Sequence, residues 1–260
     1  MITSTCEHIT INVEEKILRI RFNRPDKKNA ITRDMYAAMA DAIVDSNSEP
    51  SVRAITIEGT DGCFTSGNDL KDFMVAPDTG ETSSVGRFIQ AVCEAEKPIV
   101  AAVTGLAVGI GTTMLLHSDL VYVSENANFV MPFVNLGLVP EFGSSLVLPQ
   151  LVGQRQAAEM LMLGEPFGAD KALELGIANG VVAANKVVET ALEKAKALAK
   201  QPPAALRLTK KLMKQGNEIA IAEQINVESE KFGHSLASPE AQEAFTAFME
   251  KRAPDFSKFD

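Results

Sequence analysis

The chain has 260 residues, of which 34 are acidic and 25 are basic, so its formal net charge is −9 at pH 7. An apolar share of 46% is ordinary for a soluble globular protein and excludes a chain that is mainly disordered. The acidic balance leaves no broad basic surface, so no nucleic-acid partner is expected.

The first part of the chain alternates strands with helices. Alternating apolar residues predict strands at 9–13 and 18–22, and Thr32 is placed to cap a helix that follows it. Gly59 to Gly67 is expected to be a turn-rich loop. Further elements are predicted as strands at 52–58, 99–103, 120–123 and 129–131, and as helices at 85–96 and near 112–116. The repeated order of strand, strand and helix predicts a stacked α/β core.

Helical periodicity dominates from residue 155 onward. Helices are expected at 157–163, 169–175 and 187–200, and the first two are followed by glycine in the position of a C-terminal cap. Beyond Pro202 and Pro203 the sequence predicts helices only, at 206–213, 220–236 and 239–251. We therefore divide the chain into a core over residues 1–200 and a C-terminal helical region over residues 201–260.

The uncharged segment 98–118 has the composition of a membrane span. Gly105, Gly109 and Gly111 interrupt it, and the apolar pieces between them are too short to cross a bilayer as one helix. It is interpreted as a buried strand, a glycine turn and a buried helix, so no membrane partner is expected. Three widely spaced cysteines, no secretory signal and no peroxisomal C-terminal address favour the cytoplasm.

Two glycine-bearing turns are candidate ligand sites. The segment 64–71 follows a predicted strand and enters a helix, where Gly67 allows the backbone to aim a free N–H at a ligand oxygen. A plain strand-to-helix turn is the alternative. The segment 104–113 repeats the pattern, with unpaired helix-start amides near Ile110. A nucleotide-phosphate site is disfavoured there, because Met114 occupies the third glycine position of G-x-G-x-x-G.

Glu141 is the third candidate, because it lies among Val139, Pro140 and Phe142. A desolvated carboxylate has a raised pKa and accepts protons better near neutral pH. A solvated turn glutamate is the alternative.

The three histidines show no metal-ligand spacing, and no metal is expected. A triad of Ser144, His117 and Asp119 lacks a G-x-S-x-G elbow, and His117 is interpreted as a core or capping residue.

Together these three segments, in this order, resemble the crotonase family of enoyl-CoA hydratases and isomerases. The resemblance also covers Asn23-Arg24-Pro25, Asn29-Ala30, the segment 97–103 and the end of the chain at 247–252. It implies an α/β fold built as a spiral of ββα units, with a C-terminal helical region that assembles a homotrimer or a dimer of trimers. It also implies an acyl-CoA thioester as substrate, with no separate cofactor because coenzyme A is part of the substrate.

In this resemblance the backbone N–H groups of Asn68 and Ile110 form an oxyanion hole. Two donors on the thioester oxygen stabilise the enolate that forms when an α proton leaves. The acyl-CoA-binding residues that the resemblance implies are Ser66, Gly67, Asp69, Leu70, Lys71, Gly109, Gly111 and Phe133. Contacts with CoA are expected from Arg24, Lys27 and Lys28, and from Phe248 and Lys251 of a neighbouring subunit.

Hydratases of this family carry two catalytic glutamates, and the matching positions here hold Thr113 and Phe133. Water addition needs one group to activate water and another to manage the second proton, so these replacements argue against ordinary hydratase activity. Glu141 matches the Pro-Glu motif of the peroxisomal-type Δ3,Δ2-enoyl-CoA isomerases. The resemblance thus implies an isomerase in which Glu141 moves a proton from C2 to C4 and Phe133 excludes water.

Two alternatives stay open. One is a hydratase or another crotonase-type lyase that uses Glu141 alone. The other is a catalytically idle acyl-CoA-binding or assembly protein. A few members of the family bind RNA, but a net charge of −9 disfavours that role here.

Overall fold

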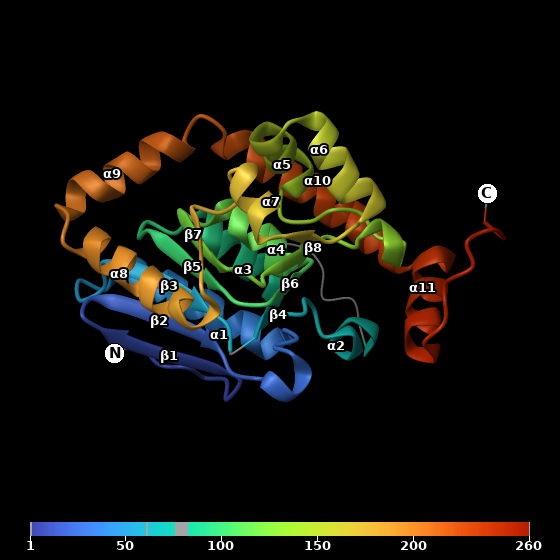
Figure 1. Cartoon of the computed structure of the whole chain (residues 1–260), viewed down its shortest axis with the longest axis horizontal. Helices are drawn as coiled ribbons and strands as arrows, with labels where there is room; N and C mark the ends of the chain where they lie inside the picture. Colours follow the sequence, from blue (N-terminus) through green and yellow to red (C-terminus); the bar gives the residue numbers. More distant parts are fainter. Residues whose placement is uncertain (1, 61, 76–82, 260) are drawn as a thin grey trace.

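The computed structural model describes residues 2–60, 62–75 and 83–259. Two sheets form the centre of the molecule (Figure 1). The larger has the order β1 (Ile9–Glu14), β2 (Ile17–Phe22), β3 (Ala54–Glu58), β5 (Ile99–Val103), β7 (Leu120–Ser124) and β10 (Gly180–Val182). The smaller has the order β4 (Cys63–Thr65), β6 (Leu106–Val108), β8 (Asn128–Val130) and β9 (Phe167–Gly168).

The chain winds as a spiral, because each successive turn adds one strand to each sheet. β3 is followed by β4, β5 by β6, and β7 by β8, and strands of neighbouring turns pair in parallel. Helices α1 (Arg33–Ser48) and α3 (Ser84–Cys93) pack against each other on one side of the larger sheet. Thr32 caps α1 by accepting a hydrogen bond from the N–H of Met35. The predicted α/β spiral is confirmed.

The sequence prediction was wrong in several short elements. The segment expected to be a loop between Gly59 and Gly67 contains β4, and the expected glycine turn after β5 contains β6. Helix α5 (Ser144–Val152) was not predicted. A three-residue strand shows no measurable periodicity, and α5 contains Pro149, so their backbone conformation depends on tertiary pairing.

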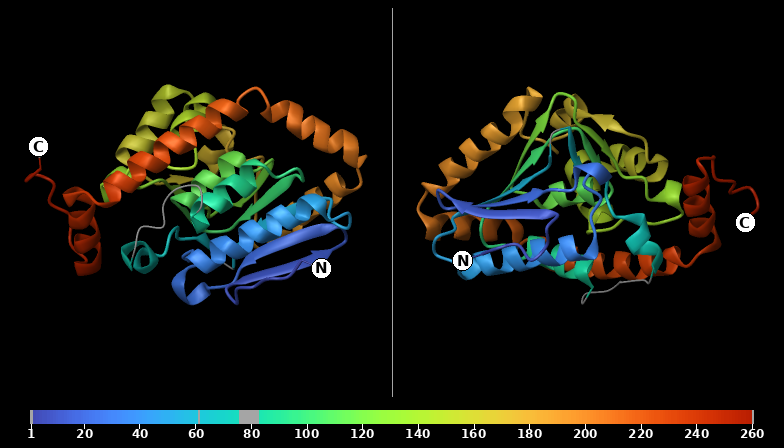
Figure 2. Two further views of the ribbon diagram at one scale, coloured as in Figure 1. Left: turned by 180° about the vertical axis from the view of Figure 1, so that it is seen from behind. Right: turned by 90° about the horizontal axis from the view of Figure 1, so that it is seen from below.

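The second half of the described chain is mainly helical. Its remaining helices are α6 (Gln154–Ala158), α7 (Ala169–Glu174), α8 (Val187–Ala199), α9 (Pro203–Lys214), α10 (Glu218–Leu236) and α11 (Pro239–Glu250). The predicted helix at 157–163 is instead α6 followed by a π-helical turn over Glu159–Leu163. Figure 2 shows α10 lying across the core, whereas α11 and the C-terminus project at one end of the molecule. The division at residue 200 stays a prediction.

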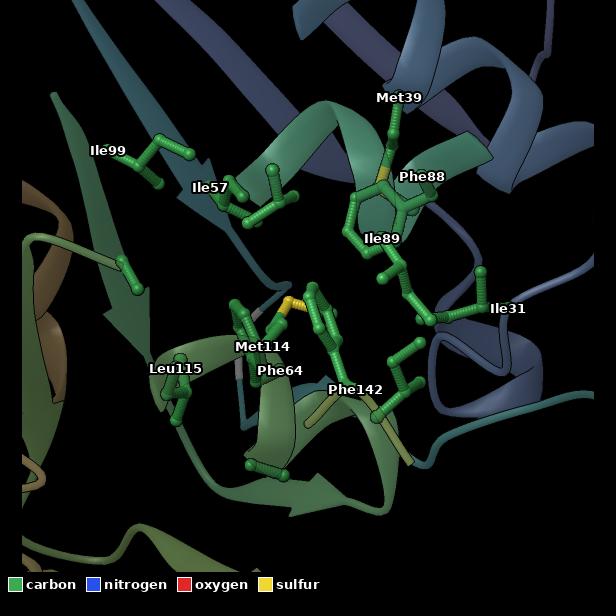
Figure 3. Close-up of a cluster of buried hydrophobic side chains, with 14 of the residues drawn as sticks. Ile31, Met39, Ile57, Phe64, Phe88, Ile89, Ile99, Met114, Leu115 and Phe142 are labelled. Atoms are coloured by element: carbon green, nitrogen blue, oxygen red, sulfur yellow. The ribbon is translucent and has the colours of Figure 1, made fainter. Parts of the chain in front are cut away.

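The core lies between the two sheets and the helices α1 and α3. β3 and β5 are buried at every position, as expected for strands covered on both faces. One face of these two strands contacts the main core. The other face packs on α8, and the contact is made by small residues of the strands and of the helix. Figure 3 shows Phe64, Phe88 and Phe142 gathered with Ile57 and Met114. Phe142 thus anchors in the core the segment that carries Glu141.

The uncharged segment 98–118 folds as β5, β6, α4 (Ile110–Thr113) and a short 3-10 helix (Met114–His117). Across the parts of the chain that the structure describes, no helix is both long and apolar enough to span a membrane.

Candidate active site

The first turn of the candidate site follows β4. Gly67 has a φ of +86°, and a Cβ there would lie 2.9 Å from the carbonyl oxygen of Val108, so both the conformation and the close approach require glycine. The Thr65 hydroxyl donates to the carbonyl oxygen of Asn29 at 2.7 Å and accepts from the N–H of Gly67 at 3.0 Å. The turn is therefore held against its neighbours before any ligand binds.

Asn68 presents its backbone N–H on the side of this turn away from Ile31. Ile31 donates its N–H to the carbonyl oxygen of Gly67 at 2.8 Å and accepts the N–H of Asp69 at 2.9 Å. This is a parallel bridge, in which the residue between the two bonded groups directs its own N–H outward. Within residues 2–60, 62–75 and 83–259, the Asn68 N–H has no hydrogen-bond acceptor.

The second turn follows β6, the strand that pairs with β4. Gly109 adopts φ +55° and ψ −118°, a conformation that favours glycine, and begins helix α4. Its carbonyl oxygen accepts the N–H groups of Thr112 and Thr113. The N–H of Ile110, the first residue of the helix, has no acceptor among the described residues. A Cβ at Gly111 would lie 2.5 Å from Cγ2 of Thr65. The two turns are thus packed directly against each other.

This arrangement brings two unpaired backbone donors, from Asn68 and Ile110, to neighbouring turns at the same end of paired parallel strands. Preorganised donors of this kind stabilise negative charge on an oxygen atom, because they need no reorganisation when the charge develops. The geometry is therefore compatible with the oxyanion hole expected from sequence.

Glu141 lies in a tight turn before α5. Phe142 and Gly143 have φ values of +62° and +70°, and the carbonyl oxygen of Glu141 accepts the N–H and the hydroxyl of Ser144 at 3.1 and 2.6 Å. The Glu141 residue is only 7% exposed, and its Oε1 has no hydrogen-bond partner in the described structure. The solvated alternative is thus excluded.

Burial, together with a smaller effect of the negative charge of Glu228, raises the pKa of Glu141 to about 8. His117 lies beneath the same turn, where its ring stacks on Phe142 at 4.4 Å and its Nε2 bonds the Phe142 carbonyl oxygen at 2.7 Å. Burial lowers the pKa of His117 to about 4, so its imidazole is neutral at pH 7. The interpretation of His117 as a core residue is confirmed.

The Ser144–His117–Asp119 triad does not form. The Ser144 hydroxyl donates to the Glu141 carbonyl oxygen, and Asp119 accepts the N–H of Ile99 at 2.7 Å. Each member therefore has a structural partner of its own.

The two positions matched to hydratase glutamates are buried. Thr113 has no exposed surface, and its Oγ1 has no hydrogen-bond partner among the described residues. Phe133 is 4% exposed, and its ring atom Cε1 lies 4.0 Å from where a Cβ of Gly109 would be. Neither side chain can give or take a proton as a carboxylate does. Of the three positions matched to catalytic glutamates in the family, 113, 133 and 141, only Glu141 therefore carries an acid.

The predicted CoA-binding segments at 24–28 and 66–71 lie side by side. Arg24 Nη1 pairs with Asp69 Oδ2 at 2.6 Å and also donates to the carbonyl oxygen of Ala30. The N–H of Ser66 donates to the carbonyl oxygen of Lys28 at 3.0 Å, and its hydroxyl donates to that of Lys27 at 3.5 Å. The ion pair between Arg24 and Asp69 therefore joins the two segments and stabilises both.

Phe248 and Lys251 are not brought to this site within one chain. Phe248 lies on α11 and is 61% exposed, and Lys251 follows that helix at the end of the molecule that carries the C-terminus (Figure 1). Their contact with CoA in a neighbouring subunit stays a prediction.

Sequence reasoning missed three residues that support the site. Tyr36 donates a hydrogen bond to the side chain of Asn68, Asn29 binds the segment before it, and Glu228 binds the turn of Glu141. Tyr36 shows only helical periodicity, and Glu228 lies in a long helix far along the chain, so neither carries a local signal. Asn29 belonged to a quoted motif but had no assigned role.

No three His, Cys, Asp or Glu side chains in the described ranges are grouped to hold a metal ion.

Comparison with known proteins identifies the family of the chain. A family model described as "Enoyl-CoA hydratase/isomerase" matches residues 12–258. The chain is 31% identical to 1,2-epoxyphenylacetyl-CoA isomerase of Escherichia coli (strain K12) over 260 residues, which cover 96% of this chain and 98% of that protein. It is 32% identical to crotonyl-CoA hydratase of Syntrophomonas wolfei over 254 residues, with coverage of 96% and 98%. The solved structure of Pseudomonas aeruginosa OdaA matches with a TM-score of 0.92 at 47% identity, covering 94% of this chain and 99% of that one. The chain therefore belongs to the enoyl-CoA hydratase/isomerase family.

Proposed function

We propose that the protein is a Δ3,Δ2-enoyl-CoA isomerase that uses Glu141 as its single acid and base. The observation that carries this proposal is the buried Glu141 carboxyl, with one oxygen unpaired, in a site where the two matched hydratase positions hold Thr113 and Phe133. An isomerase moves one proton within its substrate, so one carboxyl suffices.

The reaction begins when the Glu141 carboxylate takes a proton from C2 of a 3-enoyl-CoA. The electron pair of the C2–H bond moves toward the thioester carbonyl, and the resulting dienolate oxygen accepts the N–H groups of Asn68 and Ile110. Glu141 then returns the proton to C4, and the double bond lies between C2 and C3. A base with a raised pKa holds the proton through the dienolate stage, which suits this shuttle.

Phe133 and the buried Thr113 favour isomerisation by disfavouring the addition of water. An aromatic ring beside Gly109 limits the room for a water molecule at the site. Water that reached C3 without an activating carboxylate would react slowly. The double bond is therefore shifted rather than hydrated.

We also propose that the functional unit is a homotrimer or a dimer of trimers that binds acyl-CoA. Leu208, Leu212 and Met213 on α9 are 57%, 57% and 78% exposed, which supports a subunit interface on this helix. Light scattering of the purified protein measures the assembly directly, and a monomer would contradict this part of the proposal.

The test of the function gives purified protein either 3-enoyl-CoA or 2-enoyl-CoA thioesters of several chain lengths. Conjugated 2-enoyl product and 3-hydroxyacyl product are measured separately. The expected result is conjugation of the 3-enoyl thioester without hydration of the 2-enoyl thioester. Hydration of the 2-enoyl thioester would instead identify a single-glutamate hydratase, and binding without turnover would identify an idle acyl-CoA-binding protein.

Glu141→Gln tests the assignment of the base. It is expected to lower the isomerase rate by about 10²–10⁴-fold, because this is what general acid–base catalysis contributes and no second acid replaces Glu141. Acyl-CoA affinity is expected to stay near that of the wild type. Glu165→Gln is the control, because this exposed glutamate lies next to a proline, Pro166, as Glu141 lies next to Pro140. A fully active Glu141→Gln would overturn the assignment.

A further inference from the structure

A second buried carboxylate, Glu228 on α10, binds the turn that carries Glu141. Its Oε2 accepts the N–H of Gly143 at 2.6 Å. Its Oε1 accepts the N–H of Ser145 at 2.9 Å and the Ser145 hydroxyl at 2.5 Å. The residue is only 4% exposed, although it lies more than eighty positions beyond the turn in sequence.

These contacts favour the ionised form of Glu228. The amides of Gly143 and Ser145 belong to the start of α5, where unpaired N–H groups and the helix dipole attract negative charge. Gln224 donates its side-chain N–H to the Ser145 oxygen at 2.9 Å, which leaves the hydroxyl proton for Glu228. Burial raises the pKa of Glu228 above its ordinary value, and the three donated hydrogen bonds act in the opposite direction and offset part of the cost of burying the charge.

The turn itself needs such an anchor. Phe142 is a non-glycine residue with a φ of +62°, a strained conformation that persists only where its surroundings hold it. Glu228 binds the residues directly after Phe142, and His117 binds its carbonyl oxygen. The position of the Glu141 carboxyl thus depends on a helix that contributes no group to the reaction proposed above.

Glu228 also sets the charge around Glu141. Tyr36 from α1 has its pKa raised well above the ordinary value by burial, and Cys93 from α3 has its pKa raised to about 11, so both are neutral. His117 is neutral as well, and Lys214 at the end of α9 donates to the His117 carbonyl oxygen at 3.3 Å. The negative charge near Glu141 therefore comes from Glu228.

We propose that Glu228 is a positioning residue for Glu141, which anchors the turn that carries the base and opposes ionisation of that base through its own negative charge. The proposal rests on the function assigned to Glu141 above. It predicts that the two carboxyls titrate as a coupled pair.

Glu228→Gln tests both parts, because it keeps the shape of the side chain and removes the charge. The acid limb of the pH–rate profile is expected to move to lower pH by about one unit, which is a tenfold change in the ionisation constant. The plateau rate at high pH is expected to fall about tenfold, because an amide cannot accept all three hydrogen bonds. The ratio of variant to wild-type rate therefore rises as the pH falls. A ratio that is the same at every pH would show a purely structural role and overturn the proposal.

Glu230→Gln is the matched control, because Glu230 lies on the same helix, is exposed, and pairs with Lys231 at 3.0 Å. It is expected to leave both the limb and the plateau unchanged. Glu228→Asp keeps the charge but shortens the side chain, and it is expected to lower the plateau rate with the acid limb near its wild-type position. If the acid limb of the pH–rate profile moves as far in Glu228→Asp as in Glu228→Gln, the negative charge of Glu228 does not oppose ionisation of Glu141.

A direct titration separates this proposal from the proposed function. Glutamate carboxyls are labelled with ¹³C, and the Glu141 signal is identified by its loss in Glu141→Gln. In wild type, whether or not it turns over 3-enoyl-CoA, Glu141 is expected to titrate near pH 8 and to shift with Glu228 at lower pH. A Glu141 signal that titrates as an ordinary glutamate would overturn the proposal, even if no Glu228 variant folds.

Discussion

The phenol hydroxyl of Tyr36 donates a hydrogen bond of 2.5 Å to the side-chain oxygen Oδ1 of Asn68. Tyr36 is fully buried on α1, so it ties the turn after β4 to the first long helix of the core. The bond from Tyr36 fixes the Asn68 side chain, and the parallel bridge with Ile31 directs the Asn68 backbone N–H away from Ile31. The candidate oxyanion donor is therefore positioned by a residue that does not lie in the turn.

Tyr36→Phe is expected to lower the isomerase rate about tenfold, and the free energy of unfolding by about 1–3 kcal/mol. The variant keeps the ring in the core but leaves the half-buried Asn68 Oδ1 without its partner, and losing a hydrogen-bond partner away from bulk water costs about that much. Enzyme kinetics and denaturant unfolding measure the two effects. The control is Tyr122→Phe, at the other tyrosine of the chain. Equal effects in the two variants would contradict a specific role for Tyr36.

The pH–rate profile of the wild type is expected to rise through about pH 8. Glu141 must be ionised to accept the C2 proton, and its pKa of about 8 means that most molecules are protonated at pH 6. Below the midpoint the rate falls about tenfold per pH unit. A profile that is flat from pH 6 to pH 9 would contradict the assignment of Glu141 as base.

The same carboxyl is expected to make stability fall as pH rises. The pKa of Glu141 is about 8 in the folded state, against its usual value of 4.5, so between these values the folded protein binds more protons than the unfolded one. Its contribution to stability is thus fully present below about pH 4.5 and is lost as pH rises through about 8, by on the order of 5 kcal/mol in total.

Unfolding experiments on wild type and Glu141→Gln at pH 5 and pH 8 measure this contribution. The comparison between the two proteins is needed because His117 acts in the opposite direction, since its pKa is lowered to about 4 by burial. The wild type is expected to lose more stability than the variant over this range. Parallel curves for the two proteins would show that Glu141 is not desolvated.

Asn29→Ala is expected to lower the free energy of unfolding by about 2–4 kcal/mol. The Asn29 side chain donates to Thr60 Oγ1 and to the carbonyl oxygens of Cys63 and Phe64 at 2.8, 2.9 and 3.1 Å, and it accepts the N–H of Arg24 at 3.0 Å. Losing this buried network leaves several polar groups without partners. Denaturant unfolding is the measurement, with the exposed Asn12→Ala as control, and equal losses in both would refute the role of the network.

The double variant Thr113→Glu with Phe133→Glu is expected to gain measurable hydration of 2-enoyl-CoA, at least about tenfold above the wild type. It restores carboxyls at both positions that match hydratase glutamates, and such groups contribute about 10²–10⁴ each when well placed. The matched control is Thr113→Gln with Phe133→Gln, which has similar shape and no acid. No gain in a double variant that is folded would show that these two positions do not decide between isomerisation and hydration.

Several features of the fold were predictable because they depend on local pattern. The strand at 99–103 and the cap at Thr32 match the structure, and the helices of the C-terminal region differ from it by a few residues at their ends. β4, β6 and α5 were not predictable, since each is short or interrupted and is stabilised by contacts with distant segments.

The sequence by itself determined the chemical groups of the site, because two glycine turns, a glutamate beside a proline, and the absence of acids at positions 113 and 133 can be read along the chain. The tertiary structure alone decided that the Asn68 and Ile110 turns lie against each other, that Glu141 is buried with an unpaired oxygen, and that Glu228 binds its turn. The physical reason is that desolvation and charge depend on distances between segments far apart in sequence, and local pattern carries no information about those distances.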